Sequence, residues 1–320
     1  MMVFQGSILS ISKPTESTRC CSLQAHGANR WWYVFCALSS GESRRLLRRA
    51  LSEVATTDSY PFFTYLERAG HTNCAGTLMW PDIVLSAAHC WEETVSAIIA
   101  HVNFTNYNDN SHEHVRFVER VAIHPDFARP SSQYDIMLLK LTSPIFDVEA
   151  VIINSVPTQP LSLDRVTVIG SGQIEFQSEA RPDKLQQVQI AVVPFDFCNG
   201  IESYGGFLNA DTQLCAGEEG KDACQGDFGG PLLMKKERVQ VGIINTGIGC
   251  GEFLHPGVYT RTSAFIKWID FVKCNLTDVP CDGSSVIFSP SSSPTSAFLV
   301  KTVRLMSILS PLMMCSLISW

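Results

Sequence analysis

The sequence predicts an all-β fold of antiparallel strands, and two observations support that prediction. Between residues 54 and 262, short apolar or alternating segments rich in β-branched residues recur, with turn signals between them. The chain also holds 21 Gly and 16 Pro, while charged residues make up only 17% of it. This composition argues against a long helical bundle or a coiled coil. Short strands with glycine-rich turns are typical of antiparallel barrels or a sandwich.

The individual strands are marked by apolar alternation or by short apolar runs. We expect strands at 60–66, 83–86, 136–141, 166–169, 187–193 and 240–244. A helix is expected over 263–274, because Ser263 is a good N-cap and apolar side chains then recur on one helical face. That face carries Phe265, Ile266, Ile269 and Val272.

Residues 1–53 are expected to be a signal or pro-segment that is largely unstructured. An apolar run at 31–38 follows Arg30 and precedes small residues, as in a secretory signal, although the 30 residues before it are unusually many. A basic stretch at 44–49 fits an exposed processing site. A solvated, disordered leader and an ordinary basic linker are the alternatives.

Residues 275–320 are expected to be a Ser/Pro-rich spacer and a hydrophobic tail. Residues 284–296 contain seven Ser and two Pro, which is typical of an unfolded spacer. The apolar end at 306–320 is short for a spanning helix, which needs about 20 residues. Three interpretations stay open: a lipid-anchor signal, a spanning or peripheral helix that attaches the protein to a membrane, and an incidental tail.

The charge distribution bears on the kind of partner. The net charge is −7, and residues 50–274 carry 15 basic and 27 acidic side chains. A domain this acidic repels a phosphate backbone, so nucleic acid is not expected as a partner.

Three segments together carry the chemistry. They are Leu85-Ser-Ala-Ala-His-Cys90, Tyr134-Asp-Ile-Met-Leu-Leu139 and Asp222-Ala-Cys-Gln-Gly-Asp-Phe-Gly-Gly-Pro231. A single His, or a single Asp before an apolar strand, is more often structural. In the order histidine, aspartate, nucleophile position, the three form a specific constellation.

With these segments the chain resembles the trypsin/chymotrypsin family of serine proteases, over residues 54–274. The resemblance extends to Cys74-Ala-Gly-Thr-Leu78, Leu214-Cys-Ala-Gly217 and Pro256-Gly-Val-Tyr-Thr260. It implies two packed six-stranded antiparallel β-barrels with a C-terminal helix and an active site in the cleft between the barrels.

The resemblance also implies roles for individual residues. His89 would be the general base, Asp135 would hold its imidazole in the right tautomer, and position 228 would carry the nucleophile. The backbone N–H groups of Gly226 and Phe228 would form the oxyanion hole. Asp227 would be structural.

A specificity pocket for Lys or Arg side chains is implied as well. Asp222 would lie at its base, with Gly247 and Gly257 as its open walls. The alternative is that Asp222 is a relic whose pocket is filled by Phe228 or collapsed. Asn245-Thr246-Gly247 stands where the family has Ser-Trp-Gly, which should weaken the binding of extended peptides.

The decisive departure from the family is Phe228, which stands where the family has serine. Phenylalanine has no lone pair and no proton to give, and loss of the serine from such a triad costs about 10⁶ in turnover. The sequence therefore predicts a secreted, catalytically inactive homologue that acts by binding a protein or peptide ligand. The alternatives are an active serine endopeptidase cleaving after Lys or Arg, if the native gene encodes Ser at 228, and a non-functional gene product.

Activation is a second departure. The Ile-Val-Gly-Gly start of the active family members is absent, and residues 49–52 stand in its place. In the family that terminus pairs with the residue matching Asp227. We therefore expect either a substitute partner for Asp227 or a pocket loop in a zymogen-like form, since an unpaired buried carboxylate is costly.

The remaining predictions concern cross-links, sugars and ions. The resemblance pairs Cys74–Cys90, Cys198–Cys215 and Cys224–Cys250, which requires an oxidising compartment, and Cys274 and Cys281 are left to pair with each other. Asn103-Phe-Thr105 and Asn275-Leu-Thr277 are glycosylation sequons, both expected at exposed positions. His112-Glu-His114 is interpreted as a polar surface strand. No metal and no cofactor are expected.

Overall fold

The computed structural model describes residues 21–25, 32–36, 53–281 and 300–302, apart from 57–58, 69–72, 93–96, 109–112, 174–180, 235–237 and 253. The chain divides into two compact units, residues 1–46 and residues 47–320. The described part of the first unit is a hairpin in which β1 (Cys21–Ala25) pairs antiparallel with β2 (Trp32–Cys36). The interpretation of residues 1–53 as a signal or pro-segment stays a prediction.

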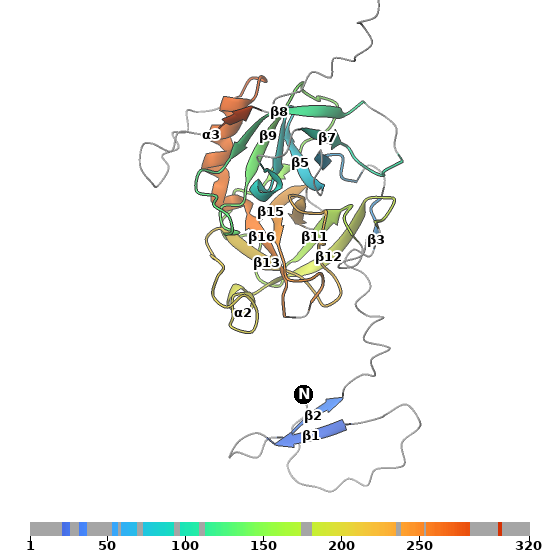
Figure 1. Ribbon diagram of the computed structural model, residues 1–320, viewed down its shortest axis with the longest axis vertical. Helices are drawn as coiled ribbons and strands as arrows, with labels where there is room; N and C mark the ends of the chain where they lie inside the picture. Colours follow the sequence, from blue (N-terminus) through green and yellow to red (C-terminus); the bar gives the residue numbers. More distant parts are fainter. Residues whose placement is uncertain are drawn as a thin grey trace, which may run out of the picture. The chain divides into compact units, whose positions relative to one another are not determined.

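Two closed six-stranded antiparallel barrels make up the second unit, which confirms the predicted fold class (Figure 1). In the first barrel, β8 pairs with β9 and closes the sheet. Its strands are β4 (Phe63–Arg68), β5 (Cys74–Trp80), β6 (Ile83–Ser86), β7 (Ile98–Val102), β8 (Val115–Ile123) and β9 (Met137–Leu141).

The second barrel closes where β15 pairs with β16. Its strands are β11 (Arg165–Gly170), β12 (Gln186–Val193), β13 (Gln213–Ala216), β14 (Pro231–Met234), β15 (Val239–Thr246) and β16 (Gly257–Arg261). Short strands extend both sheets: β3 (Glu53–Val54) on β12, β10 (Ile152–Ile153) parallel to β15, and β17 (Val300–Thr302) on β8.

Apolar alternation explains the strands, because each barrel buries its inward face. Along β12, for example, Gln186, Val188, Ile190 and Val192 are buried while the residues between them are not. All six predicted strand segments are confirmed, each within about three residues of its expected bounds.

The C-terminal helix begins later than the sequence predicts. A 3₁₀ turn, η2 (Thr262–Phe265), precedes α3 (Ile266–Leu276), and no side chain caps either one. Thr262 Oγ1 instead donates a hydrogen bond to the Gln240 carbonyl at 2.9 Å, which holds the chain against β15. The prediction that Ser263 is the N-cap is therefore wrong. Of the predicted apolar face, Phe265, Ile269 and Val272 are buried in the core, whereas Ile266 is only partly buried. Figure 1 shows α3 beside the first barrel.

Among the described residues no helix is long and apolar enough to cross a membrane. The predicted hydrophobic end at 306–320 lies outside the described residues. His89 and Asp135 of the first barrel and Phe228 of the second lie within the described residues. Phe228 packs against both barrel cores.

Candidate active site

His89 and Asp135 form a hydrogen-bonded pair at the edge of the first barrel. His89 lies on the short turn η1 (Ala88–Cys90) that follows β6, and Asp135 precedes β9. His89 Nδ1 lies 2.6 Å from Asp135 Oδ2, and the His89 backbone N–H donates to Asp135 Oδ1 at 2.8 Å. Asp135 is 1% exposed and His89 27%. A carboxylate that accepts from Nδ1 leaves Nε2 unprotonated and able to act as a base.

Asp135 is itself held by a polar network from the second barrel that sequence reasoning missed. Thr260 Oγ1 donates to the Asp135 carbonyl at 2.9 Å, and Asn245 Nδ2 donates to Thr260 Oγ1 at 2.9 Å. The same amide donates to the Ser132 carbonyl at 2.7 Å. Asn245 is thus a brace between the barrels rather than only a lost substrate contact.

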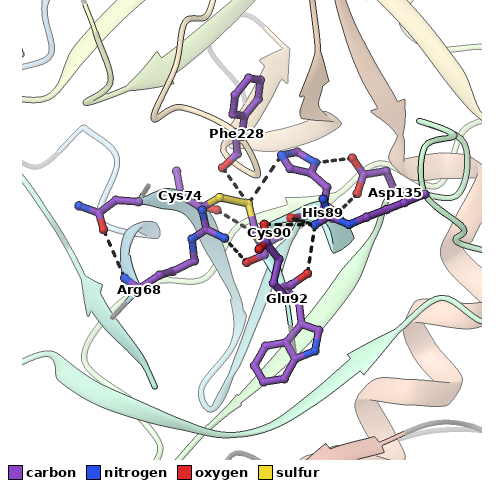
Figure 2. The surroundings of a disulfide bond; sticks show 12 residues. Arg68, Cys74, His89, Cys90, Glu92, Asp135 and Phe228 are labelled. Carbon is purple, nitrogen blue, oxygen red and sulfur yellow. Dashed lines mark hydrogen bonds and ion pairs between the residues drawn. A yellow bond between two sulfur atoms is a disulfide. The ribbon is translucent and has the colours of Figure 1, made fainter. Parts of the chain in front are cut away.

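The Phe228 ring occupies the third position of the constellation (Figure 2). Its centroid lies 5.1 Å from that of the His89 ring, edge-on at 81°. The backbone of Phe228 is fixed, since its carbonyl accepts the Ala75 N–H at 2.8 Å and the next residue, Gly229, donates to Ile244 at 2.8 Å. The groups found near the His89 ring are the Phe228 ring and the Cys90 sulfur, which lies 3.9 Å from Nε2. Neither is a nucleophile, because Cys90 is in a disulfide.

The turn before Phe228 is organised around Asp227, which is fully buried. Its carboxylate accepts the backbone N–H groups of Gly172 at 2.7 Å and Cys224 at 2.9 Å. Burial raises the pKa of Asp227 to about 6, while these N–H donors and the nearby Arg181 charge oppose that rise. Backbone donors and the Arg181 charge therefore stabilise the Asp227 carboxylate, as the expected substitute for a terminal amine.

Gly226, in the same turn, has a φ of +100°, which a residue with a side chain rarely adopts. In the described part of the chain, the N–H groups of Gly226 and Phe228 donate to no protein acceptor. Two free N–H groups beside a histidine–aspartate pair are the arrangement that would bind a carbonyl oxygen.

Comparison with protein families matches residues 52–269 to the trypsin model, described as "Trypsin". The chain belongs to the trypsin family. That assignment confirms the resemblance drawn from the three segments.

Several trypsin-family relatives are similar over most of the domain. "Transmembrane protease serine 11G" of Rattus norvegicus is 32% identical over 236 residues, which cover 71% of this chain and 56% of the relative. "Tryptase" of Mus musculus is 34% identical over 212 residues, covering 61% and 77%. The chain thus spans little more than half the length of the rat relative.

A solved structure with the same fold is mouse neuropsin, described as a serine protease expressed in the limbic system of mouse brain. The TM-score is 0.63 at 25% identity, and the match covers 69% of this chain and 98% of that chain.

A small pocket lies among the residues that the resemblance assigns to the specificity pocket. It is lined by Asp222, Gly247, Gly257 and Phe228 among others and has a volume of 60 Å³. Asp222 is 3% exposed, and burial raises its pKa to about 7. The two glycines differ in the space available for a side chain. A Cβ on Gly257 would lie 2.6 Å from Asp222 Oδ1, whereas a Cβ on Gly247 would meet nothing closer than 3.9 Å.

The three disulfides implied by the resemblance are confirmed. They are Cys74–Cys90, Cys198–Cys215 and Cys224–Cys250, and Cys274–Cys281 forms a fourth. The first holds the His89 turn to β5, and the third closes the Asp222 pocket.

The predicted sugar sites differ in exposure. Asn275 is exposed near the end of α3, whereas Asn103 is half-buried between β7 and the second barrel. His112 lies outside the described residues. Its neighbours Glu113 and His114 come together with Asp147, with ligand atoms within 4.8 Å of one another. His114 Nε2 is already paired with Asp147 at 2.8 Å, and nothing further indicates an ion there.

Proposed function

We propose that this trypsin-family protein does not cleave peptide bonds and acts outside the cell by binding a protein or peptide ligand. The observation that carries the proposal is the Phe228 ring, edge-on to His89 where an attacking oxygen would have to stand. A base and an orienting carboxylate cannot activate a nucleophile at position 228, because a phenyl ring has no proton to transfer. Attachment to a membrane through the tail stays a prediction.

Two further features support binding without hydrolysis, and a third supports a location outside the cell. The pocket above Asp222 is 60 Å³, below the roughly 300–1,000 Å³ of ordinary small-molecule sites. Phe228 adds apolar surface to the cleft between the barrels, and aromatic side chains are enriched at protein interfaces. Four disulfides require an oxidising compartment, such as the extracellular space.

A second candidate function is proteolysis after Lys or Arg, if the native gene encodes Ser at 228. The His89–Asp135 pair and Asp222 favour it, because each stands where an active enzyme would need it.

Covalent labelling separates the two functions. A biotinylated fluorophosphonate forms a bond only with an activated hydroxyl, so the protein purified from its natural source should stay unlabelled. The variant Phe228→Ser should react, and the double variant with His89→Ala should not. Peptide mass spectrometry of position 228 reads Phe or Ser directly. Labelling of the natural protein at this position would overturn the proposal in favour of proteolysis.

Site-specific photo-crosslinking tests binding at the cleft. p-Benzoylphenylalanine replaces Phe228 with another aromatic side chain, and the same residue at Phe146 is the control, since Phe146 is 73% exposed and lies outside the constellation. We expect only the residue at position 228 to form adducts with extracellular proteins or peptides. In each adduct the cross-linked partner should be intact, without a cleaved peptide bond. Equal adducts at both positions, or a cleaved partner, would contradict binding by the cleft.

A further inference from the structure

A hollow of 270 Å³ opens on the first barrel, away from the His89–Asp135 pair. Its lining includes Glu67, His101, Asn103, Phe104 and Tyr107. The volume is near the lower limit of about 300 Å³ for small-molecule sites, so it fits a ligand of one or two rings. Neither the dyad nor the Asp222 pocket contributes to it.

The floor of the hollow is aromatic and rigid. The rings of Tyr65, Phe104 and Tyr107 pack on one another with centroids 5.0–5.4 Å apart. Tyr107 donates its hydroxyl to the Ser171 carbonyl at 2.7 Å, and Asn106 forms a bridge with Lys184 of the second barrel. The segment that carries Asn103 is therefore fixed before any ligand arrives.

The rim is polar. His101 Nε2 lies 3.2 Å from Glu67 Oε2, and both side chains are partly exposed. Apolar ring faces below and paired donors and acceptors around the rim suit a sugar, which presents C–H groups on its faces and hydroxyls at its edge.

Asn103 itself lines the hollow, and it is the acceptor of the sequon Asn103-Phe-Thr105. Its φ of +58° is one that Asn adopts more readily than most residues, and its side-chain amide makes no hydrogen bond in the described part of the chain. A sugar joined to this amide is held beside the hollow, so weak contacts suffice to keep it there.

We propose that the hollow binds the first N-acetylglucosamine residues of a glycan attached to Asn103. Glu67 and His101 hydrogen-bond to the sugar hydroxyls, and the wall of the hollow that Tyr107 lines packs against the sugar ring. The glycan is thereby part of the folded surface and stabilises the first barrel. A smaller hollow of 130 Å³, lined by Asn103 and Lys184 among others, is the competing binding site for the sugar.

The test uses the full chain secreted from a eukaryotic host, carrying Asn275→Gln so that one sequon remains. Peptide mapping gives the occupancy of Asn103. The melting temperature is then measured for the intact glycoprotein, for protein trimmed to one N-acetylglucosamine by an endoglycosidase, and for Thr105→Ala, which is never glycosylated. We expect the first two to melt together and Thr105→Ala to melt about 2–4 °C lower.

The decisive step repeats this comparison in Glu67→Gln and His101→Gln, with Lys184→Met as the matched control. Both rim positions are partly exposed, so these variants should fold. We expect the sugar-dependent shift to shrink by at least half in the two rim variants and to stay unchanged in the control. The proposal would be overturned if Asn103 carries no glycan. It would also be overturned if the sugar-dependent shift in melting temperature is unchanged in the rim variants, or if it is reduced in Lys184→Met.

Discussion

The Phe228 ring stands edge-on to the His89 imidazole, with 5.1 Å between the ring centroids. The same ring lines the 60 Å³ pocket that Asp222 also lines. One side chain therefore removes the nucleophile and also limits the room for a substrate side chain.

Removing the ring should open that pocket to a cation. We expect Phe228→Ala to bind benzamidine at least about tenfold more tightly than the wild type, since one methylene in such a pocket changes affinity by roughly 10–200-fold. Calorimetry measures this directly. Equal affinities would show that Phe228 does not limit the pocket.

The affinity of Phe228→Ala for benzamidine should also depend on pH. Burial raises the pKa of Asp222 to about 7, and only the ionised carboxylate attracts the amidinium group. We therefore expect the affinity to rise about tenfold from pH 6 to pH 8, as the carboxylate loses its proton. A flat profile would mean that Asp222 is not the group that contacts the cation, and neutral benzyl alcohol is the control ligand.

The turn around Asp227 should tolerate no side chain at Gly170. A Cβ there would overlap the Asp227 carboxylate. Gly170→Ala should lower the free energy of unfolding by about 1–3 kcal/mol, as overpacking does. The control is Gly247→Ala, whose Cβ has free space. Urea denaturation should separate the two variants, and equal losses would contradict the close packing of Asp227.

The parts of the fold and site that could be predicted from sequence are those that depend on local sequence patterns, not on contacts between residues distant in the chain. Strand 83–86 and the His89 segment were predictable because local apolar patterning and motif order carry them. Asn245 was not recognised as a brace, because its partners Ser132 and Thr260 are distant in the chain. Helix α3 begins at Ile266 rather than at Ser263 because a tertiary hydrogen bond from Thr262 outweighs a local cap. The half-burial of Asn103 follows likewise from packing between the barrels.

A buried histidine should make stability depend on pH. His124 lies among Tyr134, Phe265 and Trp268, and burial lowers its pKa to about 4. The unfolded chain binds a proton near pH 6.5 and the folded chain only near pH 4, so this contribution to stability is present above pH 6.5 and lost as the pH falls to 4. We expect the wild type to lose about 3 kcal/mol more than His124→Gln over this range. Parallel losses in urea titrations would refute this.

The end of α3 should depend on a buried ion pair. Lys140 and Asp82 are both fully buried with 3.2 Å between Nζ and Oδ2, and Asp82 also accepts the Thr277 hydroxyl at 2.6 Å. Lys140→Met leaves Asp82 without its cation, so we expect a loss of about 3–5 kcal/mol in the free energy of unfolding. The surface pair Arg238–Glu149 is the control, and Arg238→Met should cost less than about 1 kcal/mol. A small loss for Lys140→Met would mean that Asp82 is stabilised by hydrogen bonds alone.

Turnover of a Lys/Arg chromogenic peptide tests the central claim most directly. We expect no turnover above that of His89→Ala for the natural protein. We also expect Phe228→Ser to gain at least about 100-fold over this background, a gain that a second change, His89→Ala, abolishes. Turnover by the natural protein that disappears in His89→Ala would contradict an inactive site, because it would require a nucleophile that Phe228 does not provide.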